Sequence, residues 1–215
     1  CGAMSNLREK LFHFTHISNL LRIAQTGLSS DNRVRAESGL KTDIGQHSIK
    51  DARRRRQVPV GPGGVVADYV PFYFAPRSPM LGSIYTGGVT SFNGGQDEIV
   101  YLVTSVDRVV ESRADLVFTD RNAALNHARF SVDPTTLDQF IDWPLMDGRM
   151  WNNTPDKPDR MERRMAEFLV HRHLPWGVLL GVATQTNAQR RHVEDLLSRV
   201  GKPTTVLARP GWYFP

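Results

Sequence analysis

Residues Phe12–Leu20 have the sequence FHFTHISNL, and this stretch decides the fold because it predicts a strand that runs directly into a helix. The strand is expected at Leu11–Phe14, where aromatic and apolar residues dominate. Apolar residues then recur at helical spacing until Gly27, which is typical of a helix end. Because side chains alternate between the two faces of a strand, His13 and Thr15 are expected on the same face.

The remaining chain mixes strands and helices in an irregular order. Further strands are predicted at Tyr69–Phe74, Ile99–Ser105, Leu116–Thr119, Glu167–His171, Val178–Thr184 and Thr204–Ala208. Further helices are predicted at Asp43–Gln57, through Met161 and Met165, and at Asn187–Val200. Residues 29–42, 76–95 and 120–159 show no clear period. The strands are too irregularly connected for a doubly wound sheet, so the pattern predicts the α+β class.

Length and composition indicate one globular domain with a basic surface. The 215 residues include 40% hydrophobic and 23% charged residues, and the formal net charge of +5 favours a polyanionic partner. Cys1 is the only cysteine, which excludes an intrachain disulfide and a cysteine-based metal site and fits a reducing cytoplasm. No apolar run approaches the roughly 18 residues that a membrane span needs. We interpret residues 1–4 as a vector remnant and residues 5–215 as the single domain.

Two polar groupings suit ligand binding, although a structural role explains each of them as well. His13 and Thr15 can grip a ligand, or they can be a hydrogen-bonded core histidine and a helix cap. Arg53–Arg56 place four guanidinium groups on little more than one helical turn. A cationic helix end is favoured by the helix dipole, but one of the four must face inward if the helix packs against the domain.

Two further positions carry the same ambiguity. Tyr73 and Phe74, followed by the constrained segment Pro76–Met80, can stack on a flat ring and hold a phosphate, or they can be part of the core. Glu167 precedes an apolar run and is either exposed at the edge of a sheet or buried and poised for function. The chain contains no P-loop, no G-x-G-x-x-G, no zinc-ligand spacing and no G-x-S-x-G.

In combination and in this order, these segments resemble the DarT family of DNA ADP-ribosyltransferases. The resemblance covers nearly the whole chain, from Phe12 to Tyr213. The phrases that carry it are FHFTHISNL, RRRRQVP, GGVVADYVPFYFAPRSPML, NGGQDEIVYLV, FTDRNAALNHARF and RRMAEFLV. It implies an ADP-ribosyltransferase fold, in which helices flank a split mixed β-sheet with a central cleft that binds NAD+ as co-substrate, and no metal.

The resemblance also implies a role for individual residues. Glu167 matches the transferase glutamate, and Arg53 matches the essential arginine, with Arg54 as the alternative. The expected NAD+-binding residues are His13, Phe14, Thr15, Asn19, Tyr73 and Phe74. The expected DNA-binding residues are Arg77, Ser78, Pro79, Met80, Arg121, Asn122, His127, Arg129 and Trp151.

The implied activity is transfer of ADP-ribose from NAD+ to a base of single-stranded DNA in a sequence-dependent manner, which releases nicotinamide and blocks replication. Thymidine is the preferred target and guanosine the alternative. A single strand is expected because a paired base would first have to be flipped out. Such a toxin implies a DarG-type macrodomain antitoxin as partner. Two other functions stay open at this point, a basic nuclease that uses His13 or His16 with Glu167, and a non-catalytic module that binds single-stranded nucleic acid.

Overall fold

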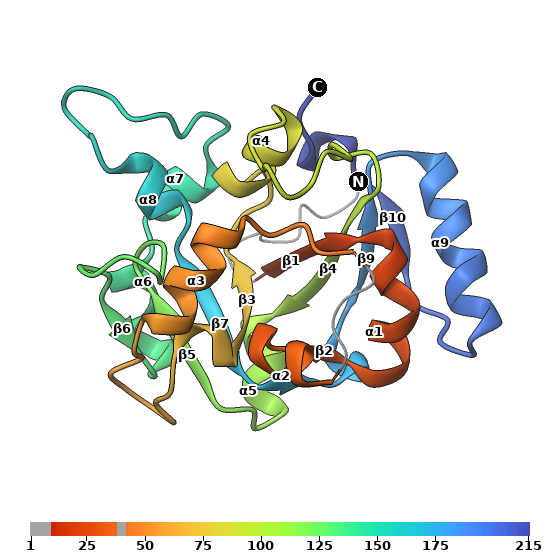
Figure 1. Ribbon diagram of the computed structural model, residues 1–215, viewed down its shortest axis with the longest axis horizontal. Helices are drawn as coiled ribbons and strands as arrows, with labels where there is room; N and C mark the ends of the chain where they lie inside the picture. Colours follow the sequence, from red (N-terminus) through yellow and green to blue (C-terminus); the bar gives the residue numbers. More distant parts are fainter. Residues whose placement is uncertain (1–9, 38–41) are drawn as a thin grey trace.

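The computed structural model describes residues 10–37 and 42–215, and its centre is an eight-stranded mixed sheet with the order β10-β9-β4-β1-β3-β7-β5-β6 (Figure 1). Its strands are β1 (Lys10–His16), β3 (Tyr69–Tyr73), β4 (Ile99–Ser105), β5 (Leu116–Thr119), β6 (Phe130–Ser131), β7 (Glu167–His171), β9 (Gly181–Thr184) and β10 (Val206–Ala208). β9 and β10 run parallel, and the other neighbours run antiparallel. β2 (Leu28–Ser29) and β8 (His173–Leu174) form a separate pair. The expected α+β fold is confirmed.

Helices surround this sheet in Figure 1. Their bounds are α1 (Leu20–Thr26), α2 (Asp31–Ala36), α3 (His47–Arg55), α4 (Pro79–Tyr85), α5 (Val106–Glu111), α6 (Leu137–Phe140), α7 (Trp143–Asp147), α8 (Arg160–Arg164) and α9 (Asn187–Arg199). The predicted strand-to-helix passage at the start of the chain is confirmed, since β1 leads through one 3-10 turn into α1 and Gly27 ends that helix at φ +81°. The predictions for β4, β5 and β7 match the observed bounds.

The apolar side chains divide into one large cluster on one face of the sheet and two smaller clusters on the other. The large cluster joins β1 and β3 to α1, α5, α7 and α9. On the opposite face, one small cluster lies over β1 and β4 and includes α4, whereas the other lies over β3, β5 and β7. The second face is therefore divided between β1 and β3, which places a cleft at the centre of the sheet.

Pro71 accounts for part of this division. Among the described residues, β1 and β3 pair at one position only, where Phe12 lies opposite Tyr73. Pro71 lies in the middle of β3 and has no N–H to donate to a neighbouring strand. The Nδ1 atom of His13 instead lies 2.8 Å from the carbonyl oxygen of Pro71, so a side chain replaces a ladder bond. The split sheet that the resemblance implied is thus confirmed.

Several elements differ from the sequence predictions. The expected helix at 43–57 is shorter, because Asp43 turns back to accept a hydrogen bond from the Gly45 amide and helix α3 begins only at His47. Helix α2 lies in the stretch without a period, and it has no buried residue that would create one. Helix α4 lies in the Pro- and Gly-rich stretch 76–95, where Ser78 caps it and Pro79 occupies its first turn.

Candidate active site

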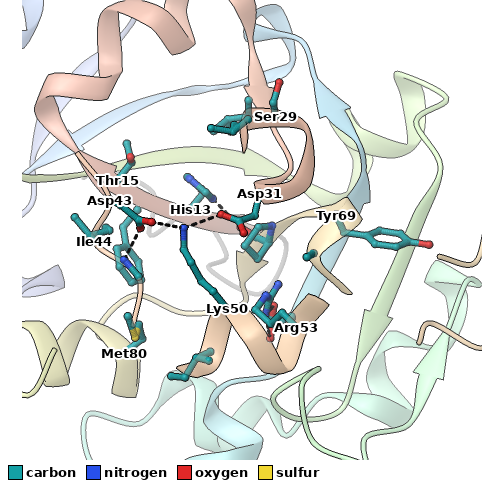
Figure 2. Close-up of a pocket in the computed structure, with 18 of the residues that line it drawn as sticks. His13, Thr15, Ser29, Asp31, Asp43, Ile44, Lys50, Arg53, Tyr69 and Met80 are labelled. Carbon is teal, nitrogen blue, oxygen red and sulfur yellow. Dashed lines mark hydrogen bonds and ion pairs between the residues drawn. The ribbon is translucent and has the colours of Figure 1, made fainter. Parts of the chain in front are cut away.

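A cleft between β1 and β3 collects most of the residues to which the sequence assigned chemistry, and α3 forms one of its walls (Figure 2). The expected NAD+-binding and catalytic residues that line it are His13, Phe14, Thr15, Asn19, Arg53, Tyr73 and Glu167. The register places His13 and Thr15 on one face of the sheet, and Phe14, Tyr73 and Glu167 on the other. The divergence of β1 and β3 allows both faces to contribute to one cleft.

Glu167 and Arg53 form a buried ion pair in this cleft. Glu167 begins β7, and 1% of its side chain is exposed, compared with 15% for Arg53 on α3. The Nη1 atom of Arg53 donates to both carboxylate oxygens of Glu167, at 2.9 and 2.8 Å. Oε1 also accepts a hydrogen bond from the Ala123 amide at 3.1 Å, whereas Oε2 retains capacity for a further donor. The Glu167 carboxylate is thus fixed in place, with one oxygen available to a ligand hydroxyl.

The ion pair keeps Arg53 protonated. Burial by itself lowers the pKa of Arg53, but the adjacent Glu167 carboxylate reverses this effect and the net pKa is raised. The Nη2 atom of Arg53 is buried and has no hydrogen-bond partner among the residues that the structure describes. A buried donor of this kind is costly unless a ligand or water satisfies it. Arg53 therefore brings a permanent positive charge and a free N–H donor to the side of Glu167.

The neighbouring Arg54 has a different environment. Its Nη2 atom lies 2.9 Å from Asp31, and its Nη1 atom lies 2.9 Å from Asp51. Arg54 is thus held by two carboxylates outside the Glu167 pair. Of the two arginines that the sequence left as alternatives, the structure brings Arg53 to the glutamate.

Lys50 links two walls of the cleft, and sequence reasoning did not identify it. Figure 2 shows Lys50 between Asp31 and Asp43, and its Nζ atom lies 2.6 Å and 2.7 Å from their carboxylates. Burial by itself raises the pKa of Asp31, but Lys50 and Arg54 reverse this effect and the net pKa is lowered. Asp31 comes from the stretch 29–42 and Asp43 from the turn before α3, and neither belongs to a motif. Only their convergence on Lys50 distinguishes them from ordinary surface residues.

His13 is fixed in orientation and in protonation state. Because a carbonyl oxygen can only accept, the contact with Pro71 assigns the proton to Nδ1 and leaves Nε2 as an acceptor. Burial lowers the pKa of His13, and the hydrogen bond to Pro71 offsets only part of this effect. His13 is therefore a neutral imidazole that can accept a hydrogen bond from a ligand hydroxyl or amide.

Phe14 and Tyr73 provide a flat aromatic wall. Their rings stack at 15° with centroids 6.0 Å apart. Burial raises the pKa of the Tyr73 phenol, and the Glu167 carboxylate adds to this effect. Tyr73 thus remains a neutral hydroxyl beside the buried ion pair. Such a wall suits contact with a planar aromatic ring of a ligand.

Asn19 holds neighbouring parts of the chain in place. Its side chain donates to the Thr15 hydroxyl at 3.2 Å and to the Thr42 carbonyl at 2.7 Å, and it accepts from the Thr42 amide at 3.1 Å. With 2% of its surface exposed, Asn19 ties the end of β1 to the chain beyond it. Its place in the cleft wall is structural at least in part.

Phe74 does not reach the cleft, in contrast to the expectation that it binds the cofactor. Its ring is 2% exposed and packs edge-on against Trp143 and Phe168 in the large apolar cluster. Tyr73 faces the cleft, whereas Phe74 points to the opposite face of the sheet, where the large apolar cluster covers it.

Four of the nine residues expected to bind DNA lie in or near the start of α4 and the cleft. Met80 and Asn122 line the cleft. Ser78 and Pro79 are instead buried at the start of α4, where the Ser78 hydroxyl accepts from the Leu81 amide, so they position the helix rather than a ligand.

Three of the residues expected to bind DNA have acidic partners. Arg129 lies 2.9 Å from Asp120, and Arg121 lies 3.4 Å from Glu162. His127 contacts the same Glu162 carboxylate at 3.0 Å. This network ties the segment between β5 and β6 to Asp120 and Glu162.

Residues 10–37 and 42–215 are the part of the chain that the structure describes. In this part of the chain, no group of three or more His, Cys, Asp or Glu side chains could hold a metal ion. Over the same residues, no helix has both the length and the apolar character to cross a membrane.

Comparison with known proteins gives concordant matches. The profile of a family described as "ssDNA thymidine ADP-ribosyltransferase, DarT" matches residues 12–214. The chain is similar to a DNA ADP-ribosyl transferase of Thermus sp. (strain 2.9), with 37% identity and 95% coverage of both chains. It is also similar to a DNA ADP-ribosyl transferase of Escherichia coli O127:H6, with 36% identity, 99% coverage of this chain and 97% of the relative.

Solved structures match the fold over the same length. The structure of Thermus sp. 2.9 DarT in complex with ADP-ribosylated ssDNA has a TM-score of 0.89 at 35% identity and covers 97% of this chain and 98% of its own. The same protein in complex with NAD+ has a TM-score of 0.82 at 36% identity, and it covers 96% of this chain and 98% of its own. The fold described above is thus shared with a protein that has been solved both with NAD+ and with ADP-ribosylated ssDNA.

Proposed function

We infer that this chain, which belongs to the DarT family of single-stranded DNA thymidine ADP-ribosyltransferases, transfers ADP-ribose from NAD+ to thymidine in single-stranded DNA. The relatives solved with NAD+ and with ADP-ribosylated DNA support both substrates. The observation of this structure that carries the proposal is the buried pair of Arg53 and Glu167 at the end of an aromatic-walled cleft.

The chemistry requires negative charge beside the ribose carbon that reacts. The bond between that carbon and the nicotinamide nitrogen breaks, and its electron pair leaves with nicotinamide and neutralises the pyridinium ring. Positive charge then develops on the ribose, and a fixed carboxylate nearby stabilises it. We assign this role to Glu167, whose Oε2 can accept a hydrogen bond from a ribose hydroxyl while Arg53 and Ala123 hold the carboxylate in place.

The acceptor must lose a proton as it attacks. N3 is the ring nitrogen of thymidine that carries a proton. The N3–H bond breaks, its proton passes to water, and its electron pair forms the new bond between N3 and the ribose carbon. Arg53 stays protonated, so we assign it the stabilisation of the anionic base through its unpaired Nη2 donor rather than proton acceptance. Met80 and Asn122 line the same cleft, and we assign them to the side from which the base enters.

For the remainder of the cleft we propose cofactor contacts. His13 can accept a hydrogen bond from the nicotinamide-side ribose or amide through Nε2, and Thr15 lies on the same strand face. Phe14 and Tyr73 can hold the nicotinamide ring against their stacked pair. Asn19 acts by holding Thr42 and Thr15.

The family also supports a biological setting. A protein that modifies DNA templates acts as a toxin, and we propose a DarG-type macrodomain antitoxin as its partner in the cytoplasm. The Thermosipho africanus DarTG chain, solved with ADP-ribose, shares the fold at a TM-score of 0.77 and 18% identity. This chain covers 51% of it, which leaves room in that protein for a second unit.

Intact-mass spectrometry of short oligonucleotides tests the proposal. The protein is incubated with NAD+ and strands that each lack one of the four bases, with Glu167→Ala and Arg53→Ala as inactive variants. We expect the mass of one ADP-ribose to be gained by every strand except the thymine-free one, and by none with either variant. Arg54→Ala is the matched control and should retain activity.

Other results would identify the alternatives. A gain that depends on guanine would reassign the target base. Cleavage of the strand without NAD+ would indicate a nuclease, and binding without any change of mass, insensitive to Glu167→Ala, would indicate a non-catalytic module.

A further inference from the structure

An exposed aromatic platform lies where α4 meets the C-terminal segment, and it consists of Arg77, Tyr85, Trp151 and Phe214. The rings of Tyr85 and Phe214 stack at 15° with centroids 5.5 Å apart. The Arg77 guanidinium lies over the Phe214 ring, 4.9 Å from its centroid. Tyr85 ends α4 with 45% of its surface exposed, so this stack is open to solvent on its outer side.

Several hydrogen bonds hold the platform in place. The buried Gln96 side chain donates to the Phe214 carbonyl at 2.6 Å and accepts from the Phe214 amide at 3.0 Å. Arg77 adopts a left-handed conformation at φ +56°, which is unfavourable for a residue other than glycine. Its amide donates to the Tyr101 hydroxyl at 3.1 Å, and its carbonyl accepts from Trp151 Nε1 at 3.0 Å.

Gly82 allows the rings to approach the helix. It lies inside α4, where glycine costs roughly 1 kcal/mol relative to alanine. A Cβ atom at this position would lie 3.3 Å from Phe214 Cζ and 3.5 Å from Trp151 Cζ2. A residue with poor helix propensity thus occupies the position against which both rings pack.

The platform is connected through the fold to the part of the cleft that contains Met80 and Glu167. Met80, at the start of α4, lines the cleft, and Tyr85 lies five residues later on the same helix, roughly 7 to 8 Å along its axis. Arg164 precedes Glu167 by three residues and donates from Nη2 to the Pro76 carbonyl at 2.8 Å, next to Arg77. The side of the cleft lined by Met80 and the platform are therefore parts of one rigid unit.

We propose that this platform binds the nucleotide next to the target thymidine, with its base stacked on Tyr85 and its phosphate near Arg77. This inference rests on the proposed DNA-modifying function. Base stacking on aromatic rings combined with a cation is how proteins hold single strands. Arg77 also has no carboxylate partner among the described residues, whereas Arg121 and Arg129 are neutralised by Glu162 and Asp120.

Substitution of Tyr85 combined with abasic oligonucleotides tests the proposal. Transfer is measured on a strand with one thymidine and on strands in which each flanking base in turn is replaced by an abasic site. For Tyr85→Ala we expect the KM for the intact strand to rise about tenfold or more, because one base–aromatic stack is lost. The KM for NAD+ should stay unchanged. Tyr85→Phe should restore the KM for DNA, and Leu207→Ala, which alters an equally exposed side chain on β10, is the matched control.

The effects of Tyr85→Ala and of the abasic site on the KM for DNA should not add. On the strand that is abasic at the stacked position, wild type and Tyr85→Ala should behave alike. Equal losses from Tyr85→Ala on every strand, or no loss on the intact strand, would overturn the proposal and leave the platform to a protein partner. Binding of the same fluorescent oligonucleotides is measured by anisotropy in parallel. If no strand is modified, the proposed transferase function fails, and the anisotropy of Tyr85→Ala still decides whether the platform binds DNA.

Discussion

The buried pair of Arg53 and Glu167 predicts a large and asymmetric effect on stability. The change to be made is Arg53→Met, which removes the guanidinium and retains an apolar side chain. The carboxylate of Glu167 would then be buried at 1% exposure with one remaining donor, the Ala123 amide at 3.1 Å. Breaking a buried pair from one side typically costs about 3 to 5 kcal/mol, because an uncompensated charge stays behind.

The reverse change should cost less. Glu167→Gln leaves Arg53 uncompensated, but this residue is 15% exposed and can recover some hydration. We therefore expect about 3 kcal/mol for Arg53→Met and about 1 to 2 kcal/mol for Glu167→Gln. In the double variant no buried charge remains, so its cost should lie at least about 1 kcal/mol below the sum of the two. For a domain of this size, 3 kcal/mol corresponds to a fall in Tm of roughly 6 to 12 °C.

Urea unfolding at pH 7, followed through the fluorescence of the four tryptophans, measures these three free energies. The m-value should stay constant across the variants, which shows that the native and unfolded states are comparable. Additive costs, or a loss below about 0.5 kcal/mol for Arg53→Met, would refute the reasoning that the two side chains form one desolvated pair.

Three further predictions follow from local geometry. Arg54→Ala should retain at least half of the transferase rate in the oligonucleotide mass assay, whereas Arg53→Ala should lose it by more than 100-fold; comparable losses would contradict their separate environments. The folded-state pKa of His13 is lowered below 6.5, so its contribution to stability is present above that pH and is lost as the pH falls. His13→Asn should therefore flatten the pH dependence of the unfolding free energy below pH 6.5, and an unchanged slope would argue against a buried neutral imidazole. Gly27→Ala should destabilise the protein by about 1 to 3 kcal/mol in thermal unfolding, since it combines φ +81° with a Cβ 2.6 Å from the Leu174 carbonyl oxygen; a neutral effect would show that this turn relaxes freely.

The sequence predicted the strongly apolar strands correctly but did not predict the short helices α2 and α4. β4, β5 and β7 could be predicted because nearly all of their residues are buried, which leaves runs of aromatic and β-branched side chains. Helix α2 could not, because it buries no residue and is held by its Ser30 cap and by charge contacts. Helix α4 was missed because proline and glycine usually indicate a loop. Here Pro79 occupies the first turn of the helix, and Gly82 is the position against which the rings of Phe214 and Trp151 pack.

Site residues show the same contrast. His13, Tyr73 and Glu167 lie within the phrases of sequence that carry the resemblance, and all three line the cleft. Phe74 lies in the same phrase, but it packs in the large apolar cluster, because a motif gives adjacency in the chain and not the direction of a side chain. Asp31, Asp43 and Lys50 belong to no motif, and only folding brings the three together.

The sequence by itself determined the family, the α+β class, the buried strands and the set of chemical groups that the site could draw on, because these depend on local patterns and on matched phrases. The tertiary structure alone decided which arginine meets Glu167, which cations are already neutralised and which rings remain open to a ligand. The physical reason is that these outcomes depend on contacts between residues far apart in the chain, such as Arg53 and Glu167, which are 114 positions apart. Whether a charge is paired, buried or free is decided by the partner that folding places beside it.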